Sequence, residues 1–264
     1  DTFILNCIFY NSQPGNCSIE LEDDAPLSFI KSDKYENPES FFVKPGLNSV
    51  SFLIRAMKEY VNLKGLAIES VYFGGGTPSQ LDEKDFRKVF DTVRRVYGME
   101  NCHEITLEAN PDDLCPEFLQ MLSELPFNRI SMGIQTFDDT TLKLLKRRHN
   151  AAQAIRAVEL CRAHGFRNIS IDLIYGLPGE TTERWEKDLQ QAIALDVEHI
   201  SAYHLIYEEG TPIYKMLQKH QVEEVDEDSS VRFFTLLIDR LHEAGYEHYE
   251  ISNFCKPGMY SRHN

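Results

Sequence analysis

The strongest chemical signal in the sequence is a run of three glycines that directly follows an apolar strand. Residues 71–78 read Val-Tyr-Phe-Gly-Gly-Gly-Thr-Pro. Glycine adopts positive φ without a Cβ penalty, so the backbone can turn tightly here and bring bare N–H groups close to a ligand. Taken alone, the triplet fits a tight turn between a strand and a helix equally well. With the signals at other strand ends, it predicts a small-molecule cofactor site that includes Gly74, Gly75, Gly76 and Thr77.

Polar residues also stand at or near the ends of other apolar strands. Glu108 follows one strand, Gln135 ends the next, and Arg147 follows the helix after Gln135. A carboxylate at a strand end can accept hydrogen bonds from a ligand ammonium or hydroxyl group. Each residue also has a structural alternative, because carboxylates cap turns or pair with arginine, and Arg147 can be an exposed helix-end charge. Asp172 fits that alternative least, since it lies inside an apolar strand and is costly to bury without a partner.

Alternating strand and helix signals from Ser49 onward position these residues. Strands separated by single helices form a parallel sheet through right-handed crossovers, and the number of units favours a full or partial β/α barrel with its chemistry at the C-terminal ends of the strands. Residues 3–10 could form a first strand, but 11–48 lacks a clear period. The predicted strands are 69–73, 104–108, 128–134, 167–174, 198–206 and 246–251, and the predicted helices are 49–62, 82–97, 116–124, 138–146, 151–164, 181–194 and 229–243.

Length and charge limit the class of protein. The 264 residues fit one large domain, and the net charge of −15 opposes extended contact with phosphate backbones or anionic lipid, so nucleic acid is not an expected partner. No apolar run approaches the roughly 20 residues that span a bilayer, and the first residues do not read as a signal peptide, so we expect a cytoplasmic protein. The acidic run 223–228 is predicted to be a solvated loop leading into a helix that begins near Ser229.

Six cysteines are scattered along the chain with no Cys-x-x-Cys pair, which predicts neither a disulfide framework nor a zinc site. We expect most of them to be reduced core thiols. They are Cys7, Cys17, Cys102, Cys115, Cys161 and Cys255.

The ordered motifs of residues 49–264 resemble those of radical SAM proteins of the oxygen-independent coproporphyrinogen III oxidase family, most closely its heme chaperone branch. The resemblance implies an incomplete β/α barrel of the TIM-like type. It also implies that the glycine-rich strand end holds the methionyl part of S-adenosylmethionine, and that Glu108, Gln135, Arg147 and Asp172 complete the pocket. The motifs are FGGGTPS at 73–79, EANP at 108–111, SMGIQTF at 131–137, DLIYGLP at 172–178, SAYHL at 201–205, EGTP at 209–212 and ISNF at 251–254.

The sequence departs from this family at two places. The family opens with Cys-x-x-x-Cys-x-x-Cys, which holds a [4Fe-4S] cluster. Here only Cys7 and Cys17 lie near the N-terminus, with nine residues between them, so the ligand set is incomplete and no metal ligands are predicted. Residues 1–48 are expected to be an irregular segment that does not resemble the family. In the chaperone branch a His-Asn pair opens a heme-binding motif that precedes a C-terminal domain, and we expect this sequence to lack that domain. His263 matches the histidine of the motif and is a candidate heme ligand, but it is expected to be solvated here.

The resemblance implies a heme chaperone-like protein that binds S-adenosylmethionine and, in the complete protein, a [4Fe-4S] cluster and heme. Its expected partners are this cofactor, a tetrapyrrole and a heme-acceptor protein. One alternative is an oxygen-independent coproporphyrinogen III oxidase, an enzyme that oxidatively decarboxylates propionates in porphyrin biosynthesis. Another is a cluster-free binding scaffold. The motifs at 135–137 and 208–212 favour the chaperone branch, and whether the protein is an enzyme stays open, as does its oligomeric state.

Overall fold

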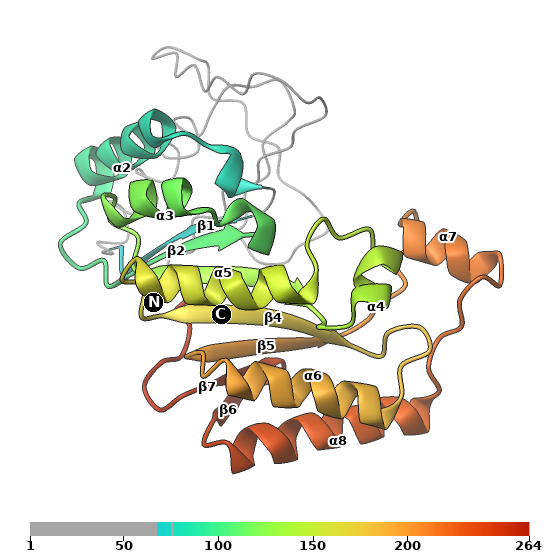
Figure 1. Cartoon of the computed structure of the whole chain (residues 1–264). Coiled ribbons are helices and arrows are strands. Elements are labelled where there is room, and N and C mark those ends of the chain that lie inside the picture. Colours follow the sequence, from blue (N-terminus) through green and yellow to red (C-terminus); the bar gives the residue numbers. More distant parts are fainter. Residues whose placement is uncertain (1–67, 75–76, 264) are drawn as a thin grey trace, which may run out of the picture. The chain divides into compact units, whose positions relative to one another are not determined.

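The computed structural model describes residues 68–74 and 77–263, in which strands and helices alternate along the chain (Figure 1). The chain divides into two compact units. The first runs to Leu107 and includes His263, and the second comprises residues 108–262 with residue 264. The predicted strand 3–10, the irregular segment 1–48 and the helix 49–62 lie outside the described residues.

The first unit contains a parallel strand pair covered by one helix. β1 (Ser70–Phe73) pairs with β2 (Glu104–Ala109), and η1 (Pro78–Gln80) precedes α2 (Glu83–Tyr97). The ring of Phe73 lies 5.6 Å from that of Phe86 and 5.3 Å from that of Phe90, which fixes the helix on the strand through aromatic packing. The Asp82 side chain caps α2 by accepting a hydrogen bond from the Asp85 amide.

The second unit is built on a sheet that is parallel in its first part and antiparallel at its far edge. β3 (Arg129–Gln135), β4 (Ile169–Tyr175) and β5 (His199–His204) are parallel, whereas β7 (Asn253–Cys255) is antiparallel to both β5 and β6 (Glu247–Glu250). The strand order along the sheet is β1-β2-β3-β4-β5-β7-β6. The helices of this unit are η2 (Pro111–Asp113), α3 (Pro116–Ser123), α4 (Asp139–Leu144), α5 (Ala151–Ala163), α6 (Thr182–Ala194), α7 (Pro212–Gln218) and α8 (Glu227–Glu243).

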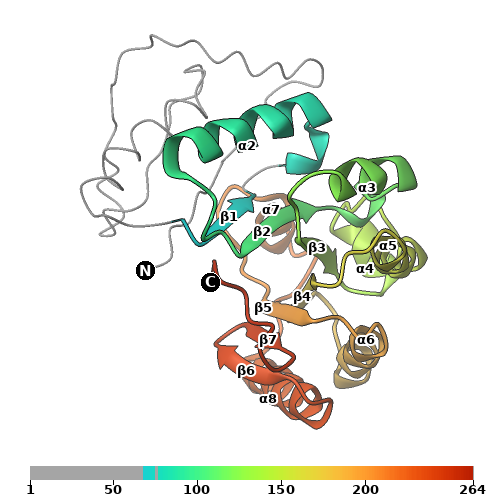
Figure 2. The same cartoon turned by 90° about the vertical axis from the view of Figure 1, so that its left-hand side faces the viewer.

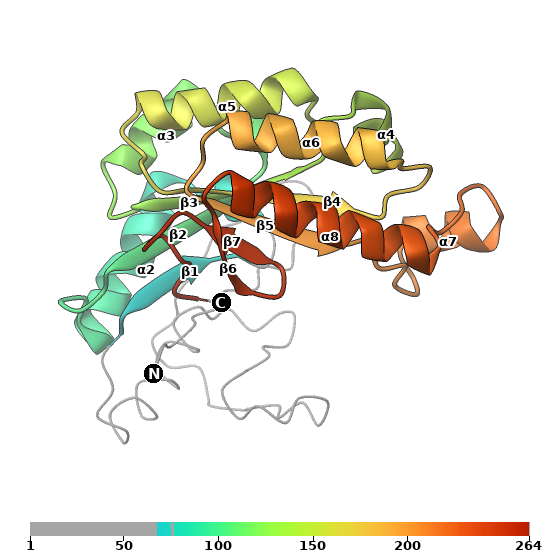
Figure 3. The same cartoon turned by 90° about the horizontal axis from the view of Figure 1, so that it is seen from below.

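Each central strand of the second unit has an apolar and a polar face. In β4, Ile169, Ile171 and Leu173 are fully buried, and the alternate residues Ser170 and Asp172 point to the opposite face. Helices α5 and α6 lie along one side of β4 and β5 (Figure 3), and α8 runs beside α6 (Figure 1). The indole Nε1 of buried Trp185 in α6 donates to the backbone oxygen of Phe233 in α8 at 3.0 Å. The helices therefore cover the apolar face and leave the polar face available for a site.

The predicted strand 246–251 is wrong in extent and in its implied parallel direction. The chain instead forms the short antiparallel pair β6 and β7, which are labelled next to each other in Figure 2. All four residues of β6 are exposed, so the strand has no buried side chains that would stabilise a longer pairing. The Glu250 carboxylate accepts hydrogen bonds from the Ser252 amide and from the Asn253 side chain, which closes the turn between the two strands.

Two helices also differ from expectation. α7 was not predicted, and it contains no buried residue, so the sequence carries no apolar period to mark it. α8 begins at Glu227, slightly before the predicted residue 229, with Asp226 as its N-cap. The acidic residues lead into a helix N-terminus as expected, and Glu227 and Asp228 belong to its first turn, where negative charge is favourable.

The described cysteines do not form disulfide bonds, and two of the four lie in the core. Cys161 and Cys255 are buried, Cys102 is half-buried and Cys115 is exposed. Burial raises the pKa of the Cys161 thiol to about 12, which makes this side chain an unreactive apolar group. Within the described ranges, no helix has the length and apolar character needed to cross a membrane.

Candidate functional site

Asp172 occupies the polar face of β4, level with Gly133 of β3 and Ser201 of β5. The residue is half-buried, so its side chain keeps partial contact with solvent. Burial, with a smaller contribution from the negative charge of Glu108, raises the pKa of Asp172 to about 7. The Ser201 side chain and the positive charges of two arginines lower the pKa, but they offset only part of this shift. Asp172 therefore changes charge close to neutral pH.

Arg147 is held in place from two sides and is not the exposed helix-end charge of the structural alternative. Its Nη2 donates to the side-chain oxygen of Asn110 at 2.7 Å and to the backbone oxygen of Gly133 at 2.9 Å. Burial lowers the pKa of the guanidinium group. Its Nε is buried and has no hydrogen-bond partner among the described residues. An unpaired donor of this kind is costly unless a water or ligand satisfies it.

Gln135 ends β3 in an unusual backbone conformation. Its φ is +73°, in the left-handed region that non-glycine residues seldom adopt, and the register of β3 against β4 shifts between Gly133 and Gln135. The side chain turns back over residue 133, where an added Cβ would lie 2.8 Å from Gln135 Nε2 and 3.4 Å from Arg147 Nη2. Gly133 is thus needed for the close approach of these two side chains. Such an outlier at a strand end is often associated with a binding site.

The structure brings together the four predicted site residues that belong to the second unit. Glu108 and Arg147 each act electrostatically on Asp172, and Gln135 and Arg147 both flank Gly133. Gly74 and Thr77 belong to the first unit, where Gly74 is buried and Thr77 is exposed. Gly75 and Gly76 lie outside the described residues. Cofactor binding by all eight residues stays a prediction.

Sequence reasoning missed two residues that hold this group together. Asn110 positions Arg147 through a hydrogen bond, and Ser201 lies opposite Asp172 and lowers the pKa of its carboxyl group. Both lie in sequence motifs at the ends of strands, but a short polar residue there is equally common in turns. The strand register provides the missing information, because Ser201 lies directly opposite Asp172 in the parallel pair.

The loop after β4 contains a second carboxyl group that sequence reasoning missed. The Glu180 carboxylate accepts hydrogen bonds from the amides of Gly176 at 2.6 Å and Leu177 at 3.2 Å. Burial raises the pKa of Glu180 to about 7 despite these bonds, and the nearby charge of Asp188 adds to the shift. Glu180 is therefore a half-buried carboxyl group whose hydrogen bonds fix the loop at the C-terminal end of β4.

His263 is packed against the first unit, so the expectation of a solvated histidine is wrong. Its ring centroid lies 3.8 Å from that of Tyr72, and its Nδ1 lies 3.7 Å from Oε1 of Glu104. The side chain is 18% exposed. Stacking on an aromatic ring and attraction to a buried carboxylate together account for this position.

The described residues do not provide a metal centre. In residues 68–74 and 77–263, no group of three or more His, Cys, Asp and Glu side chains could hold a metal ion. The cysteines in this part of the chain therefore do not fit a [4Fe-4S] cluster, which requires closely placed thiolates. Cys7 and Cys17 lie outside the described residues, so the prediction made for them stays a prediction.

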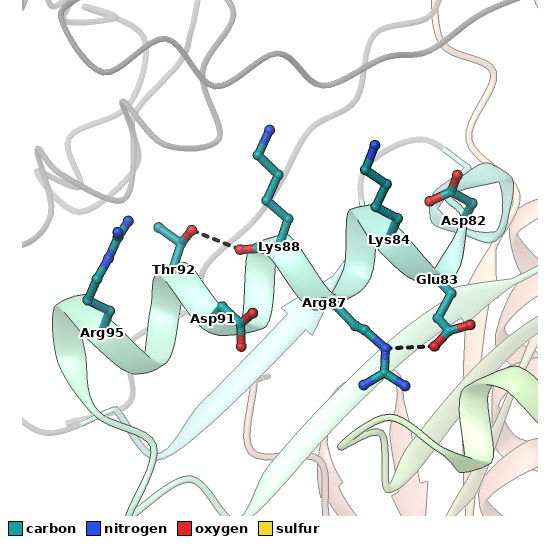
Figure 4. Close-up of a pocket in the computed structure, with 8 residues that line it drawn as sticks. All are labelled: Asp82, Glu83, Lys84, Arg87, Lys88, Asp91, Thr92 and Arg95. Carbon is teal, nitrogen blue, oxygen red and sulfur yellow. Dashed lines mark hydrogen bonds and ion pairs between the residues drawn. The ribbon is translucent and has the colours of Figure 1, made fainter.

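A separate pocket in the first unit lies along α2 (Figure 4), lined by residues 82–84, 87, 88, 91, 92 and 95. Lys84, Lys88 and Arg95 extend from one side of the helix, whereas Arg87 turns to Glu83, with 2.6 Å between Nε and Oε1. The pocket contains none of the predicted site residues. Charged side chains of both signs at helical spacing are typical of a solvated helix face.

Asp172, Glu108, Gln135 and Arg147, here called the Asp172 group, have the chemistry of a binding site for a ligand that carries both positive and negative charge. The carboxyl groups of Glu108 and Asp172 can accept hydrogen bonds from hydroxyl or ammonium groups, and the buried Nε of Arg147 can donate to an oxygen atom. Asn110 and Gly133 fix the arginine beforehand, which reduces the entropy lost on binding.

Comparisons with known proteins point to one family. The model of the Radical SAM superfamily matches residues 30–192. The heme chaperone HemW of Bacillus subtilis is 38% identical over 198 residues, which are 75% of this chain and 52% of that protein. The mouse mitochondrial radical S-adenosyl methionine domain-containing protein 1 is 33% identical over 213 residues, 80% of this chain and 48% of that protein. The chain thus spans about half the length of these relatives.

Among solved structures, the coproporphyrinogen III oxidase HemN of Escherichia coli resembles the chain with a TM-score of 0.64 at 23% identity. The likeness covers 78% of this chain and 48% of that one. At this identity it concerns the fold alone. With the strand order and the family match, it confirms the predicted α/β fold, an incomplete β/α barrel of the TIM-like type.

Proposed function

The chain belongs to the radical SAM superfamily, and from this premise we propose that it is the S-adenosylmethionine-binding barrel of a heme chaperone-like protein. The observation that carries the proposal is the arrangement of Asp172, Glu108 and Arg147 on the polar face of the sheet. S-adenosylmethionine has a positive sulfonium, an ammonium, a carboxylate and ribose hydroxyls. These groups match the two carboxyl groups and the buried guanidinium donor.

In this proposal the chain's residues bind and orient the cofactor. Glu108 and Asp172 accept hydrogen bonds from its hydroxyl or ammonium groups, and Arg147 donates to an oxygen atom. The proposal also includes Gln135, Gly74, Gly75, Gly76 and Thr77 as cofactor-binding residues. S-adenosylmethionine supplies an activated sulfonium centre, and the reactivity belongs to the cofactor while the protein contributes placement and exclusion of water.

Similarity to proteins named heme chaperones supports a role in heme handling in preference to the oxidase. The proposal includes a tetrapyrrole ligand, a heme-acceptor protein and a cytoplasmic location, with residues 49–264 as the barrel. His263 is a candidate heme ligand in it. The [4Fe-4S] cluster belongs to the proposal for the complete protein only, because the described residues do not fit it. The oxidase and the cluster-free scaffold remain the alternatives.

The experiment follows two readouts on the complete protein after anaerobic reconstitution. We expect heme to stay with the protein through gel filtration, as measured by its absorbance, and coproporphyrinogen III to remain unconverted. His263→Ala should reduce heme retention, while the exposed His242→Ala in α8 serves as the matched control. Conversion without heme retention would favour the oxidase, and the absence of both would favour the scaffold.

A further inference from the structure

Asp188 is a buried carboxyl group on α6 that the site described above does not include. It is 5% exposed, and each of its oxygen atoms accepts a hydrogen bond. Oδ2 accepts from the Thr136 hydroxyl at 2.5 Å, and Oδ1 accepts from the Phe137 amide at 3.0 Å. A buried carboxylate is stable only where such bonds replace those to water. The two residues that supply them follow Gln135 directly in the chain.

Arg184, one turn earlier on α6, holds the same segment from its other end. Its Nη2 donates to Asp138 Oδ1 and to Thr141 Oγ1, each at 2.7 Å. The Asp138 amide donates to Thr136 Oγ1 at 3.1 Å, which joins the two anchors. Because residues four positions apart share one face of a helix, a single face of α6 fastens residues 136–138.

Gln135 lies between this anchored segment and the paired part of β3. The pairing with β4 ends at Gln135, opposite Leu173, and the register shifts just before it. With a φ of +73°, Gln135 is a strained residue, and such a residue persists only where the surrounding structure holds it. The sheet fixes the chain before Gln135, and Asp188 fixes the chain after it through Thr136 and Phe137.

The backbone conformation of Gln135 decides where its amide group lies. The side chain folds back over Gly133, where an added Cβ would lie 2.8 Å from Gln135 Nε2 and 3.4 Å from Arg147 Nη2. Gly133 is level with Asp172 of β4. If the following residues were released, Gln135 would relax toward the negative φ that non-glycine residues favour, and its amide would leave this position.

We propose that Asp188 is a positioning residue of the cofactor pocket, because it holds Gln135 in the left-handed conformation that places the Gln135 amide beside Arg147. The inference rests on the proposed function, since it requires that this pocket binds S-adenosylmethionine and that Gln135 contacts it. Asp188 belongs to a helix that covers the apolar face of the sheet (Figure 3), so it acts through Gln135 and does not touch the ligand.

The test is a double-mutant cycle, measured by calorimetric titration of the chain with S-adenosylmethionine. Gln135→Ala should weaken binding by about twofold to tenfold, which corresponds to one hydrogen bond. Asp188→Ala should weaken binding by up to the same factor, and it should have no effect when Gln135→Ala is already present, because both changes remove the same contact. Asp188→Asn keeps an oxygen atom for the Phe137 amide, so it should retain more affinity than Asp188→Ala.

Glu186→Ala is the matched control on the same helix. Glu186 Oε1 lies 2.7 Å from Nε of Arg240 in α8, so this change should lower stability without altering affinity. If Asp188→Ala does not fold, Thr136→Val takes its place in the cycle, because it removes only the hydroxyl donor. Urea denaturation followed by the fluorescence of Trp185, the only tryptophan in the chain, reports whether each variant is folded.

The inference and the proposed function fail in different ways. Unchanged affinity in folded Asp188→Ala, or an equal loss with and without Gln135→Ala, would overturn the inference and leave the proposed function intact. The same holds if Gln135→Ala binds normally, or if Glu186→Ala weakens binding as much as Asp188→Ala does. If the unmodified chain does not bind S-adenosylmethionine, the proposed function fails and the inference fails with it.

Discussion

Asp172 is the residue whose chemistry depends most on its surroundings. An ordinary aspartate is fully ionised at neutral pH, but burial and the Glu108 charge raise the pKa of Asp172 to about 7. Uptake of a cationic or donor-bearing ligand would favour the ionised form, so ligand affinity and the protonation of Asp172 are linked.

This shift predicts a pH dependence of stability. Between the ordinary pKa of 3.8 and about 7, the folded state holds a proton on Asp172 that the unfolded state releases. The free energy of unfolding should therefore fall as pH rises through this interval, by at most about 1.4 kcal/mol per pH unit, with no further change above it. Urea denaturation from pH 4 to 8 measures this contribution as the difference between the unmodified chain and Asp172→Asn.

The comparison with a variant is necessary because burial also raises the pKa of Glu180 to about 7, which acts in the same direction. Asp239→Asn, at an exposed position in α8, provides the control. Parallel pH profiles for the unmodified chain and Asp172→Asn would contradict the raised pKa of Asp172.

Two adjacent arginines allow a second prediction. Arg147 is tied to Asn110 and Gly133, whereas exposed Arg148 pairs with Asp112 and Asp113 at the surface. Arg147→Lys should lower the free energy of unfolding by about 1.5 to 3 kcal/mol, because the shorter ammonium group cannot reproduce the buried guanidinium contacts. Arg148→Lys should cost less than about 1 kcal/mol. Urea denaturation midpoints measure both, and equal costs would show that Arg147 has no special structural role.

At the residue scale, sequence reasoning identified side chains that are chemically unusual for their position. Glu108 and Asp172 were found because carboxyl groups at the ends of apolar strands require an explanation. Asn110 and Ser201 were missed, because short polar residues occur in turns and strands for many reasons. Their roles depend on pairs that are distant in sequence: Asp172 and Ser201 are 29 residues apart, and Asn110 and Arg147 are 37 residues apart. Local patterns do not contain this information.

At the scale of elements, the turn after β4 depends on two glycines in different ways. Both Gly176 and Gly179 have positive φ, but only Gly176 is crowded: an added Cβ would lie 2.6 Å from His204 Nε2. That ring is held by a hydrogen-bonding contact of 3.0 Å with Ser230 Oγ. The turn therefore joins β4 to the start of α8 through His204.

Gly176→Ala should be more destabilising than Gly179→Ala. Both variants incur left-handed strain of about 1 to 2 kcal/mol, and Gly176→Ala adds about 1 to 3 kcal/mol because His204 must move. Gly179 has no atom within 4 Å of an added Cβ and isolates the strain alone. Thermal and urea denaturation of both variants measure the difference, and similar losses would mean that the His204 contact is readily relaxed.

The predictability of the elements followed their burial. Strands β1 to β5 and helices α2 to α6 were predicted close to their observed bounds, because each has an apolar face that repeats at the period of a strand or helix. α7 buries nothing, and β6 is exposed throughout, so the sequence pattern did not mark their bounds. The reversal between β6 and β7 depends on the hydrogen bonds of Glu250, which periodicity does not reveal.

For the molecule as a whole, the parallel arrangement of β1 to β5 was predictable, whereas the antiparallel edge and the complete site were not. Alternating strands and helices favour a parallel sheet whose C-terminal strand ends form one functional edge. The glycine-rich strand end and the Asp172 group belong to two compact units, and two of the three glycines lie outside the described residues. Whether the glycines and the carboxyl groups share one ligand is therefore a question for binding experiments.

The most direct measurement is calorimetric titration of the chain with S-adenosylmethionine, in parallel with Glu108→Gln and Asp172→Asn. The account predicts measurable binding by the unmodified chain. Each substitution should weaken it by about tenfold to a hundredfold, since a hydrogen bond to a charged group is worth about 1.5 to 3 kcal/mol. Circular dichroism must show that all three proteins are folded. Equal affinities in the three, or no binding by the unmodified chain, would contradict the claim that these carboxyl groups hold the cofactor.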